Sequence, residues 1–157
     1  MKRLQVHNKA LYLSVLAGSG FFFLAALGPG ILDVRASESI GSWQYRVFEL
    51  LCHQDSARSF NISGVQMAVC SRCISIYGFF FFGMMSMPVF ALVKPSLQKQ
   101  EIKWLIAAIL LNLVDVIGNY FGIWSNTHIS RFLLGGAFGI ILALILTNEF
   151  FTTNKSE

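Results

Sequence analysis

Three cysteines and one histidine are the residues of this chain whose types and spacing are best suited to chemistry. Cys52 and His53 are adjacent, and Cys70 and Cys73 are separated by two residues. Three thiolates and one imidazole form a ligand set that suits a tetrahedral zinc ion. Soft thiolates suit copper(I) or iron as well. The sequence therefore predicts a metal site formed by Cys52, His53, Cys70 and Cys73, with zinc favoured.

The same cysteines allow two other interpretations. A C-x-x-C pair at the start of a helix is the arrangement of thiol–disulfide exchange, because the helix N-terminus and a cation such as Arg72 stabilise a thiolate. Cys70 and Cys73 would then react, with Cys52 as the resolving thiol. In the second interpretation the cysteines only pack. Tyr77 lies one turn beyond Cys73 on the same helical face and joins the predicted site in either chemical case.

A second polar cluster is predicted inside the membrane. Asp115 interrupts an apolar run, and Asn119 follows one helical turn later. An acid at this depth is costly and usually faces a partner or a water-filled cavity. The expected partner is Arg131, and Asn126 is expected in the same pocket. Asp115 and Arg131 are interpreted either as catalytic groups of a substrate or proton site, or as an ion pair that fixes helix packing.

The composition indicates what must position these residues. Apolar residues make up 55% of the 157-residue chain and charged residues 13%, against about 25% charged in a typical soluble chain. The mean hydropathy is +0.61. A helix needs roughly 20 apolar residues to cross the hydrocarbon layer. Four apolar segments approach this length, at residues 10–32, 74–93, 104–124 and 132–148.

We therefore expect an all-α membrane protein, a single membrane domain over residues 1–157 with four transmembrane helices in a bundle. The first segment is longer than the core of a cleaved signal peptide and is expected to stay as an anchor. Gly135, Gly136 and Gly139 predict close approach of the fourth helix to a neighbour. The net charge is +4, but the sequence contains no basic patch with interleaved aromatic residues, so it does not indicate nucleic-acid binding.

The lysines predict the orientation. All of them fall in residues 1–9, 94–103 and the C-terminal tail. Four crossings put these regions on one side, and the positive-inside rule makes that side the cytoplasm, with both termini. Residues 33–73 are then extracytoplasmic. Within them, residues 42–51 carry an apolar face with Trp43 and predict a short helix lying at the membrane interface.

An ordered set of short polar motifs resembles a known family. The motifs are CHQ at 52–54, RSF at 58–60, CSRC at 70–73, IY at 76–77, Asp115, SN at 125–126, and Arg131 with Gly135. Together they resemble the domain of unknown function 2085 family of small prokaryotic membrane proteins, from about Cys52 to Gly139. The resemblance implies an integral protein of a prokaryotic cytoplasmic membrane and implies no particular activity. The chain has Ser75 and Leu134 where glycine and threonine are expected.

These observations favour an integral membrane protein with an extracytoplasmic metal site above a polar intramembrane pocket. Two alternatives stay open: a membrane thiol–disulfide oxidoreductase, and a non-catalytic transport or assembly component. The sequence does not decide whether the protein is an enzyme or which small-molecule substrate it takes. Besides the lipid bilayer, the expected partners are further copies of the chain or another membrane protein. Four crossings make only a narrow pore in a monomer, so transport would favour an oligomer.

Overall fold

Four long helices dominate the computed structural model, which describes residues 3–6, 8–28, 38–93 and 101–154. The long helices are α1 (Lys9–Ala26), α3 (Ser71–Val93), α4 (Glu101–Tyr120) and α5 (His128–Phe150). The smaller elements are β1 (Arg3–Val6), α2 (Glu38–Glu49), the 3-10 turn η2 (Ser56–Arg58), β2 (Asn61–Ile62), β3 (Val65–Gln66) and β4 (Phe151–Asn154). The short strands were not expected from the sequence.

Each long helix contains a stretch of 18 or 19 residues that is long and apolar enough to cross a membrane. Large apolar side chains along α1 and α4 point away from the protein, for example Leu13, Leu24, Leu111 and Val114. So much exposed apolar surface is unfavourable in water and normal against lipid. The prediction of an all-α membrane protein with four membrane-spanning helices is confirmed.

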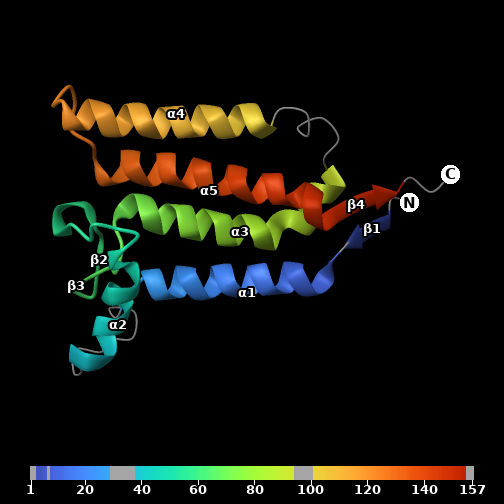
Figure 1. The fold of residues 1–157 in the computed structure, drawn as a ribbon, viewed down its shortest axis with the longest axis horizontal. Helices are drawn as coiled ribbons and strands as arrows, with labels where there is room; N and C mark the ends of the chain where they lie inside the picture. The colour runs from blue at the N-terminus through green and yellow to red at the C-terminus, as the bar shows by residue number, and fades with distance from the viewer. Residues whose placement is uncertain (1–2, 7, 29–37, 94–100, 155–157) are drawn as a thin grey trace.

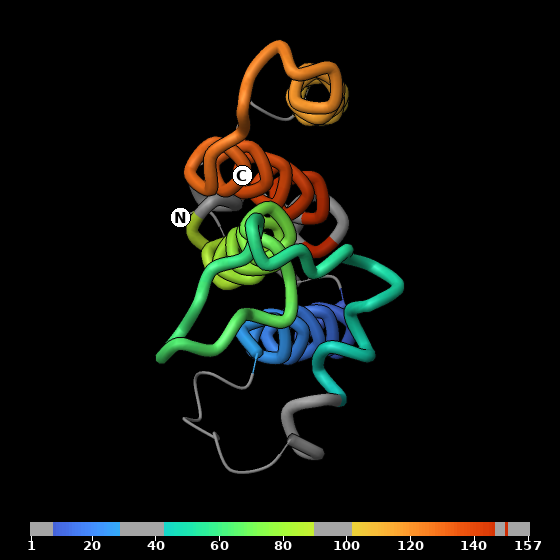
Figure 2. The backbone as a smooth tube through the Cα atoms, turned by 90° about the vertical axis from the view of Figure 1, so that its left-hand side faces the viewer, coloured from blue at the N-terminus to red at the C-terminus, as the bar shows by residue number. Residues whose placement is uncertain are grey.

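The helices form a row in place of the expected bundle (Figure 1). The neighbouring pairs are α1 with α3, α3 with α5, and α5 with α4. The end-on view in Figure 2 shows the same order, with α4 at one edge and α1 at the other. The α3–α5 pair makes the most extensive contact. The two edge helices therefore present most of their surface to the surroundings.

Glycines on α5 explain the close contact with α3. A Cβ atom on Gly139 would lie 2.5 Å from the carbonyl oxygen of Ile76, and one on Gly136 would lie 2.7 Å from the ring of Phe79. At Gly135 the nearest atom would be Ser75 Oγ, at 2.3 Å. Any larger side chain would push the helices apart, because real Cβ atoms do not approach so closely. The predicted close approach of the fourth helix is therefore present.

Helix ends differ from the predicted boundaries by a few residues. α1 ends at Ala26, and Gly28 follows with a φ of +80°, a conformation that glycine adopts at little cost. α4 ends at Tyr120, and Gly122 has a φ of +69°. α5 begins at His128, earlier than predicted, because Thr127 and Ser130 cap each other's backbone N–H groups through their hydroxyl oxygens.

β1 and β4, the first and last described elements, lie at the same end of the row (Figure 1). β1 pairs antiparallel with β4, with Arg3 opposite Asn154. α2, β2 and β3 lie at the opposite end, where α1 ends and α3 begins (Figure 1). We call the end that contains α2, β2 and β3 the cysteine end. The position of β1 and β4 together at the other end agrees with an even number of membrane crossings. Residues 29–37 and most of the lysine-rich loop, 94–100, belong to the predicted topology but lie outside the described residues.

Candidate metal centre and polar cavity

A network of amide hydrogen bonds folds the segment between Cys52 and Cys70 back on itself. Gln54 Nε2 donates to the carbonyl of Tyr45 at 2.6 Å, and Gln66 Nε2 donates to the carbonyl of Gln54 at 2.7 Å. The hydroxyl of Tyr45 closes the loop by donating to the carbonyl of Gln66. Burial raises the pKa of Tyr45, so this hydroxyl keeps its proton at neutral pH. The network brings the two ends of the segment together.

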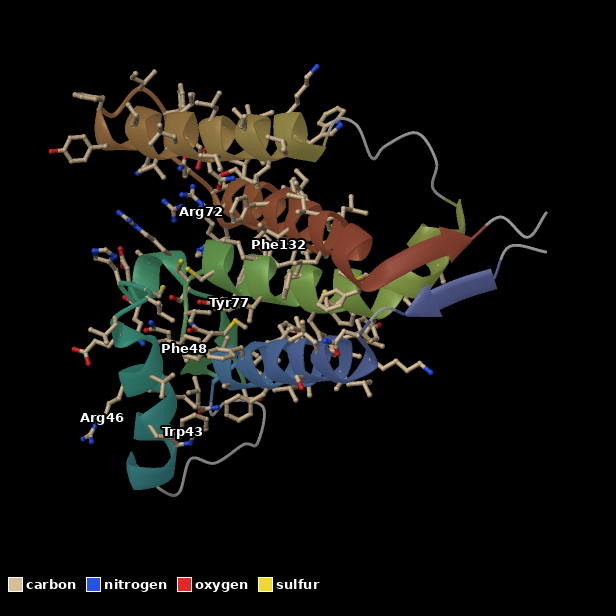
Figure 3. All side chains as sticks on the ribbon, turned by 45° about the vertical axis from the view of Figure 1, so that its right-hand side comes forward. Trp43, Arg46, Phe48, Arg72, Tyr77 and Phe132 are labelled. Atoms are coloured by element: carbon tan, nitrogen blue, oxygen red, sulfur yellow. The ribbon has the colours of Figure 1, made fainter. Side chains whose placement is uncertain are left out.

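The helix before Cys52 has one buried and one exposed side. Phe48 is fully buried, and its carbonyl accepts a hydrogen bond from the Cys52 N–H at 2.8 Å. Trp43, Val47, Leu50 and Leu51 are exposed. The ring of Trp43 stacks on the exposed Phe21 of α1, with ring centres 6.4 Å apart. Figure 3 shows Phe48 and Trp43 at the end of α1. An exposed aromatic and aliphatic side at this level fits a helix resting on the membrane interface.

The three cysteine sulfurs lie together at the start of α3. Their Sγ atoms are all within 4.8 Å of one another. Cys70 Sγ lies 3.5 Å from Cys73 Sγ, and the backbone N–H of Cys70 donates to Cys52 Sγ at 3.2 Å. All three thiols are free. The structure thus joins the cysteines of two sequence-distant motifs in one cluster, with Cys52 buried and the other two half-buried.

The local electrostatics favour a thiolate in this cluster. Cys70 immediately precedes the first residue of α3, where the positive end of the helix dipole stabilises a negative charge. Hydrogen bonding with the thiol of Cys52, and then with that of Cys73, lowers the pKa of Cys70 far below its ordinary value. A thiolate is the form that binds metals and acts as a nucleophile.

Two of the other predicted site residues lie near the cluster without joining it. His53 follows Cys52, but its side chain is exposed and is not in the group of metal-ligating atoms that the sulfurs form. Tyr77 lies one turn beyond Cys73 and packs on Phe48, with ring centres 5.8 Å apart. It lines an apolar groove of about 400 Å³ between α1, α3 and α5.

Asp115 is held by Arg72 and Asn126. Arg72 Nη2 donates to Asp115 Oδ2 in an ion pair whose side chains are only 19% and 11% exposed. Asn126 Nδ2 donates to the same carboxylate oxygen at 2.7 Å and to the backbone carbonyl of Asp115 at 3.2 Å. The expected ion-pair partner, Arg131, is therefore not the one found. Gly135 of α5 leaves room for the Arg72 side chain, because a Cβ atom there would lie 3.1 Å from Arg72 Cγ.

A polar cavity of about 310 Å³ lies beside this ion pair. Its walls come from several segments of the cysteine end: Arg58, Arg72, Val116, Asn119, Tyr120, Asn126 and Arg131. Asn119 Oδ1 accepts a hydrogen bond from the backbone N–H of Asn126 at 3.0 Å. The structure thus places three of the predicted pocket residues, Asn119, Asn126 and Arg131, around one cavity, with Asp115 directly behind its wall.

Two arginines of this region were not predicted in these roles. Arg72 lies between the two cysteines of CSRC and was expected only to add positive charge near the thiolates. Arg58 lines the cavity and pairs with Asp55 at 3.0 Å. The RSF motif at residues 58–60 could have indicated a role for Arg58, because it places a cation in the segment that connects Cys52 with Cys70. For Arg72, no spacing rule connects residue 72 with residue 115.

Membrane-length helices with a cysteine cluster and an arginine-lined cavity at one end define this chain as an integral membrane protein with a polar end. The family model described as "Predicted membrane protein (DUF2085)" matches residues 52–145. The chain belongs to this family, as the motifs indicated. It is 32% identical over 151 residues to the uncharacterized protein MJ1492 of Methanocaldococcus jannaschii, covering 91% of this chain and 94% of the relative. No solved structure matches the chain significantly.

Proposed function

We propose that this membrane protein carries a metal site with Cys52, His53, Cys70 and Cys73 as ligands, and that zinc is the ion which the donor set fits best. One observation carries the proposal: three sulfurs from two distant segments lie within 4.8 Å of one another. Copper(I) and iron are the other ions that accept such ligands. The polar cavity next to the cluster would be where a substrate or partner group binds.

The spacing of the sulfurs fits a metal without large movement. Thiolates that bind zinc at about 2.3 Å in tetrahedral geometry lie about 3.8 Å from one another. The observed Cys70–Cys73 separation of 3.5 Å is close to that value. Cysteines that only fill a core need no such convergence, since any apolar side chain serves there.

His53 is proposed as the fourth ligand because it follows Cys52 directly. Its exposed imidazole can reorient without losing packing. If His53 completes the site, the metal is a structural link between the connecting segment and α3. If water takes the fourth position, the metal can activate that water or polarise a substrate. The catalytic roles predicted for Asp115 and Arg131 apply only in the second case.

We further propose that the cysteine end faces away from the cytoplasm and that both termini lie inside. The support is the positive-inside rule, since Lys9 at the start of α1 and Lys103 in the first turn of α4 lie at the opposite end of the row. The other four lysines, at positions 2, 94, 99 and 155, belong to the same three sequence regions. In a prokaryote the site would then face the oxidising side of the cytoplasmic membrane, where bound metal would also protect the thiols from forming a disulfide.

Metal analysis of the purified protein tests this proposal. The protein is extracted in detergent, its metal content is measured by mass spectrometry, and its reactive thiols are counted before and after chelation. We expect one metal ion per chain and thiols that react only after the metal is removed. Ser71→Ala is the matched control, because Ser71 lies between the cysteines and should not affect metal content. A metal-free protein with one disulfide per chain would contradict the proposal.

One observation also favours the second candidate, thiol–disulfide exchange. Cys70 and Cys73 are close enough for oxidation with a small rotation, and the pKa of Cys70 is lowered by its thiol neighbours. Under this alternative the isolated protein contains no metal. Cys70→Ser abolishes attack on a disulfide substrate, whereas Cys73→Ser leaves that attack intact and prevents only the Cys70–Cys73 disulfide. The thiol count described above separates the two candidates.

A further inference from the structure

Three arginines from three separate segments converge on the polar cavity at the cysteine end. Arg58 comes from η2, Arg72 from the first turn of α3, and Arg131 from the first turn of α5. Like charges repel one another more strongly near a low-dielectric membrane than in bulk water. Arg58 and Arg72 are close enough to act on Arg131 by this repulsion. Such a convergence is costly unless something negative offsets it.

The carboxylates of the region offset only part of this charge. Asp55 pairs with Arg58, and Asp115 pairs with Arg72 and accepts from Asn126 as well. Among the described residues, no carboxylate makes an ion pair with Arg131, which is half-buried. Asp115 and Cys70 act on Arg131 only from beyond ion-pair distance. The cavity therefore keeps one guanidinium group without a directly paired anion, with two further guanidinium groups beside it.

We propose that this cavity binds a phosphate-type oxyanion, supplied by free phosphate or by the headgroup of an anionic lipid, with Arg131 as its main ligand. A guanidinium group presents a planar pair of N–H donors that matches phosphate oxygens, which is why arginine is used for such recognition. Arg58 and Arg72 add charge to the site. The cavity, about 310 Å³, lies at the small end of the roughly 300–1,000 Å³ that is common for ligand pockets.

This inference names a ligand for the polar cavity of the proposed function and does not require that the cysteines bind metal. The cavity can be cationic in the folded protein because Arg72, which is largely buried, is paired with Asp115, while the Arg58–Asp55 pair is open to solvent. Arg131, without such a partner, is the residue whose charge the ligand would neutralise. Arg131 is thus the position where the inference is tested.

The experiment compares wild-type protein with Arg131→Gln and Arg131→Lys in a maltoside detergent, which carries no phosphate. Arg46→Gln is the control, because Arg46 is exposed on α2, away from Arg72 (Figure 3). One arm titrates inorganic phosphate against chloride at constant ionic strength and records the unfolding temperature. The other arm measures retention of phosphatidylglycerol against phosphatidylcholine by native mass spectrometry. Metal content is measured on every sample.

We expect wild type and Arg46→Gln to bind one of the two probes, and Arg131→Gln to bind it about 10- to 100-fold more weakly, the loss expected for a hydrogen-bonded charge. Arg131→Lys should recover part of the affinity. Binding of inorganic phosphate in lipid-free detergent assigns a free anion, and binding of phosphatidylglycerol alone assigns a lipid headgroup. Equal binding by wild type and Arg131→Gln, or binding of neither probe by wild type, overturns the inference. Phosphate binding that disappears on chelation assigns the anion to the metal and also overturns it.

Discussion

The cysteine cluster and the arginine cavity meet at residues 70–73 but are held in place by different forces. The cysteines are part of a hydrophobic cluster that includes Phe48, Val69 and Ile74. The cavity is bounded mainly by charged and amide side chains, together with Val116 and Tyr120, and the Arg72–Asp115 pair lies beside it. Packing and backbone hydrogen bonds position the sulfurs, whereas charge positions the cavity. A single four-residue motif, CSRC, can therefore serve two sites that respond differently to substitution.

Loss of a thiolate should give the largest effect and should be confined to the cluster. The binding free energy of a structural zinc ion in a four-ligand site is about 10–16 kcal/mol. Loss of one of the four ligands in Cys70→Ser should therefore weaken metal binding by about a quarter of this, roughly 3–4 kcal/mol. The expected result is a protein that loses its metal during purification. Mass spectrometry of the metal measures this, and retention of stoichiometric metal in Cys70→Ser would show that this sulfur is no ligand.

Asp115→Ala should act on the cavity and leave metal content unchanged. Removing the carboxylate leaves Arg72 partly buried without its partner, which costs about 3 kcal/mol in a buried pair. Thermal unfolding in detergent should report the loss. Asp115→Asn is the gentler variant, since it keeps the shape and one acceptor. If Asp115→Ala lowers the unfolding temperature less than Asp115→Asn does, water already solvates Arg72 and the ion pair does not stabilise the fold.

A substitution in the shared scaffold should disturb both regions together. Gly139→Val places a branched side chain where a Cβ would already lie 2.5 Å from the carbonyl oxygen of Ile76. Overpacking of this kind costs about 1–3 kcal/mol and would separate α3 from α5. Both the unfolding temperature and the metal affinity should fall. Gly18→Val is a matched control, because nothing lies near a Cβ at Gly18.

Gln54→Ala should give the smallest effect and should reach the cluster only through the loop. It removes one hydrogen bond to Tyr45, worth about 1 kcal/mol. Because Gln54 has a φ of +51°, Gln54→Gly loses the same bond but relieves the backbone, and should be less destabilising. Unfolding temperatures of the two variants test this order. The reverse order would show that the side-chain bond does not hold the loop.

The membrane fold could be predicted from the sequence because apolar length and helical geometry are local properties. The four spans, the close approach at Gly135–Gly139 and the short helix at residues 42–51 all follow from composition and spacing. The row arrangement could not be predicted, because the apolar side chains of α1 and α4 can face either lipid or another helix. Their sequence therefore does not distinguish a row from a bundle. The strands β1 and β4 carry no strong pattern either.

The candidate site could be predicted only in part. The convergence of Cys52 with Cys70 and Cys73 was expected from the shared membrane face, and the structure brings these sulfurs together. The ion-pair partner of Asp115 was not predicted correctly. Arg72 and Arg131 both lie at the cysteine end, and the sequence alone does not show which of the two guanidinium groups reaches the carboxylate. The departure at Ser75 has a local explanation: its hydroxyl donates to the carbonyl of Arg72 at 2.7 Å and fills space beside Gly135.

X-ray absorption at the edge of the bound metal tests the central claim most directly. The measurement is made on detergent-purified wild type and His53→Ala. For wild-type zinc protein we predict three sulfur neighbours at about 2.3 Å and one nitrogen neighbour at about 2.0 Å, with the nitrogen replaced by oxygen in His53→Ala. A shell of oxygen and nitrogen atoms without sulfur would contradict a metal centre built on Cys52, Cys70 and Cys73.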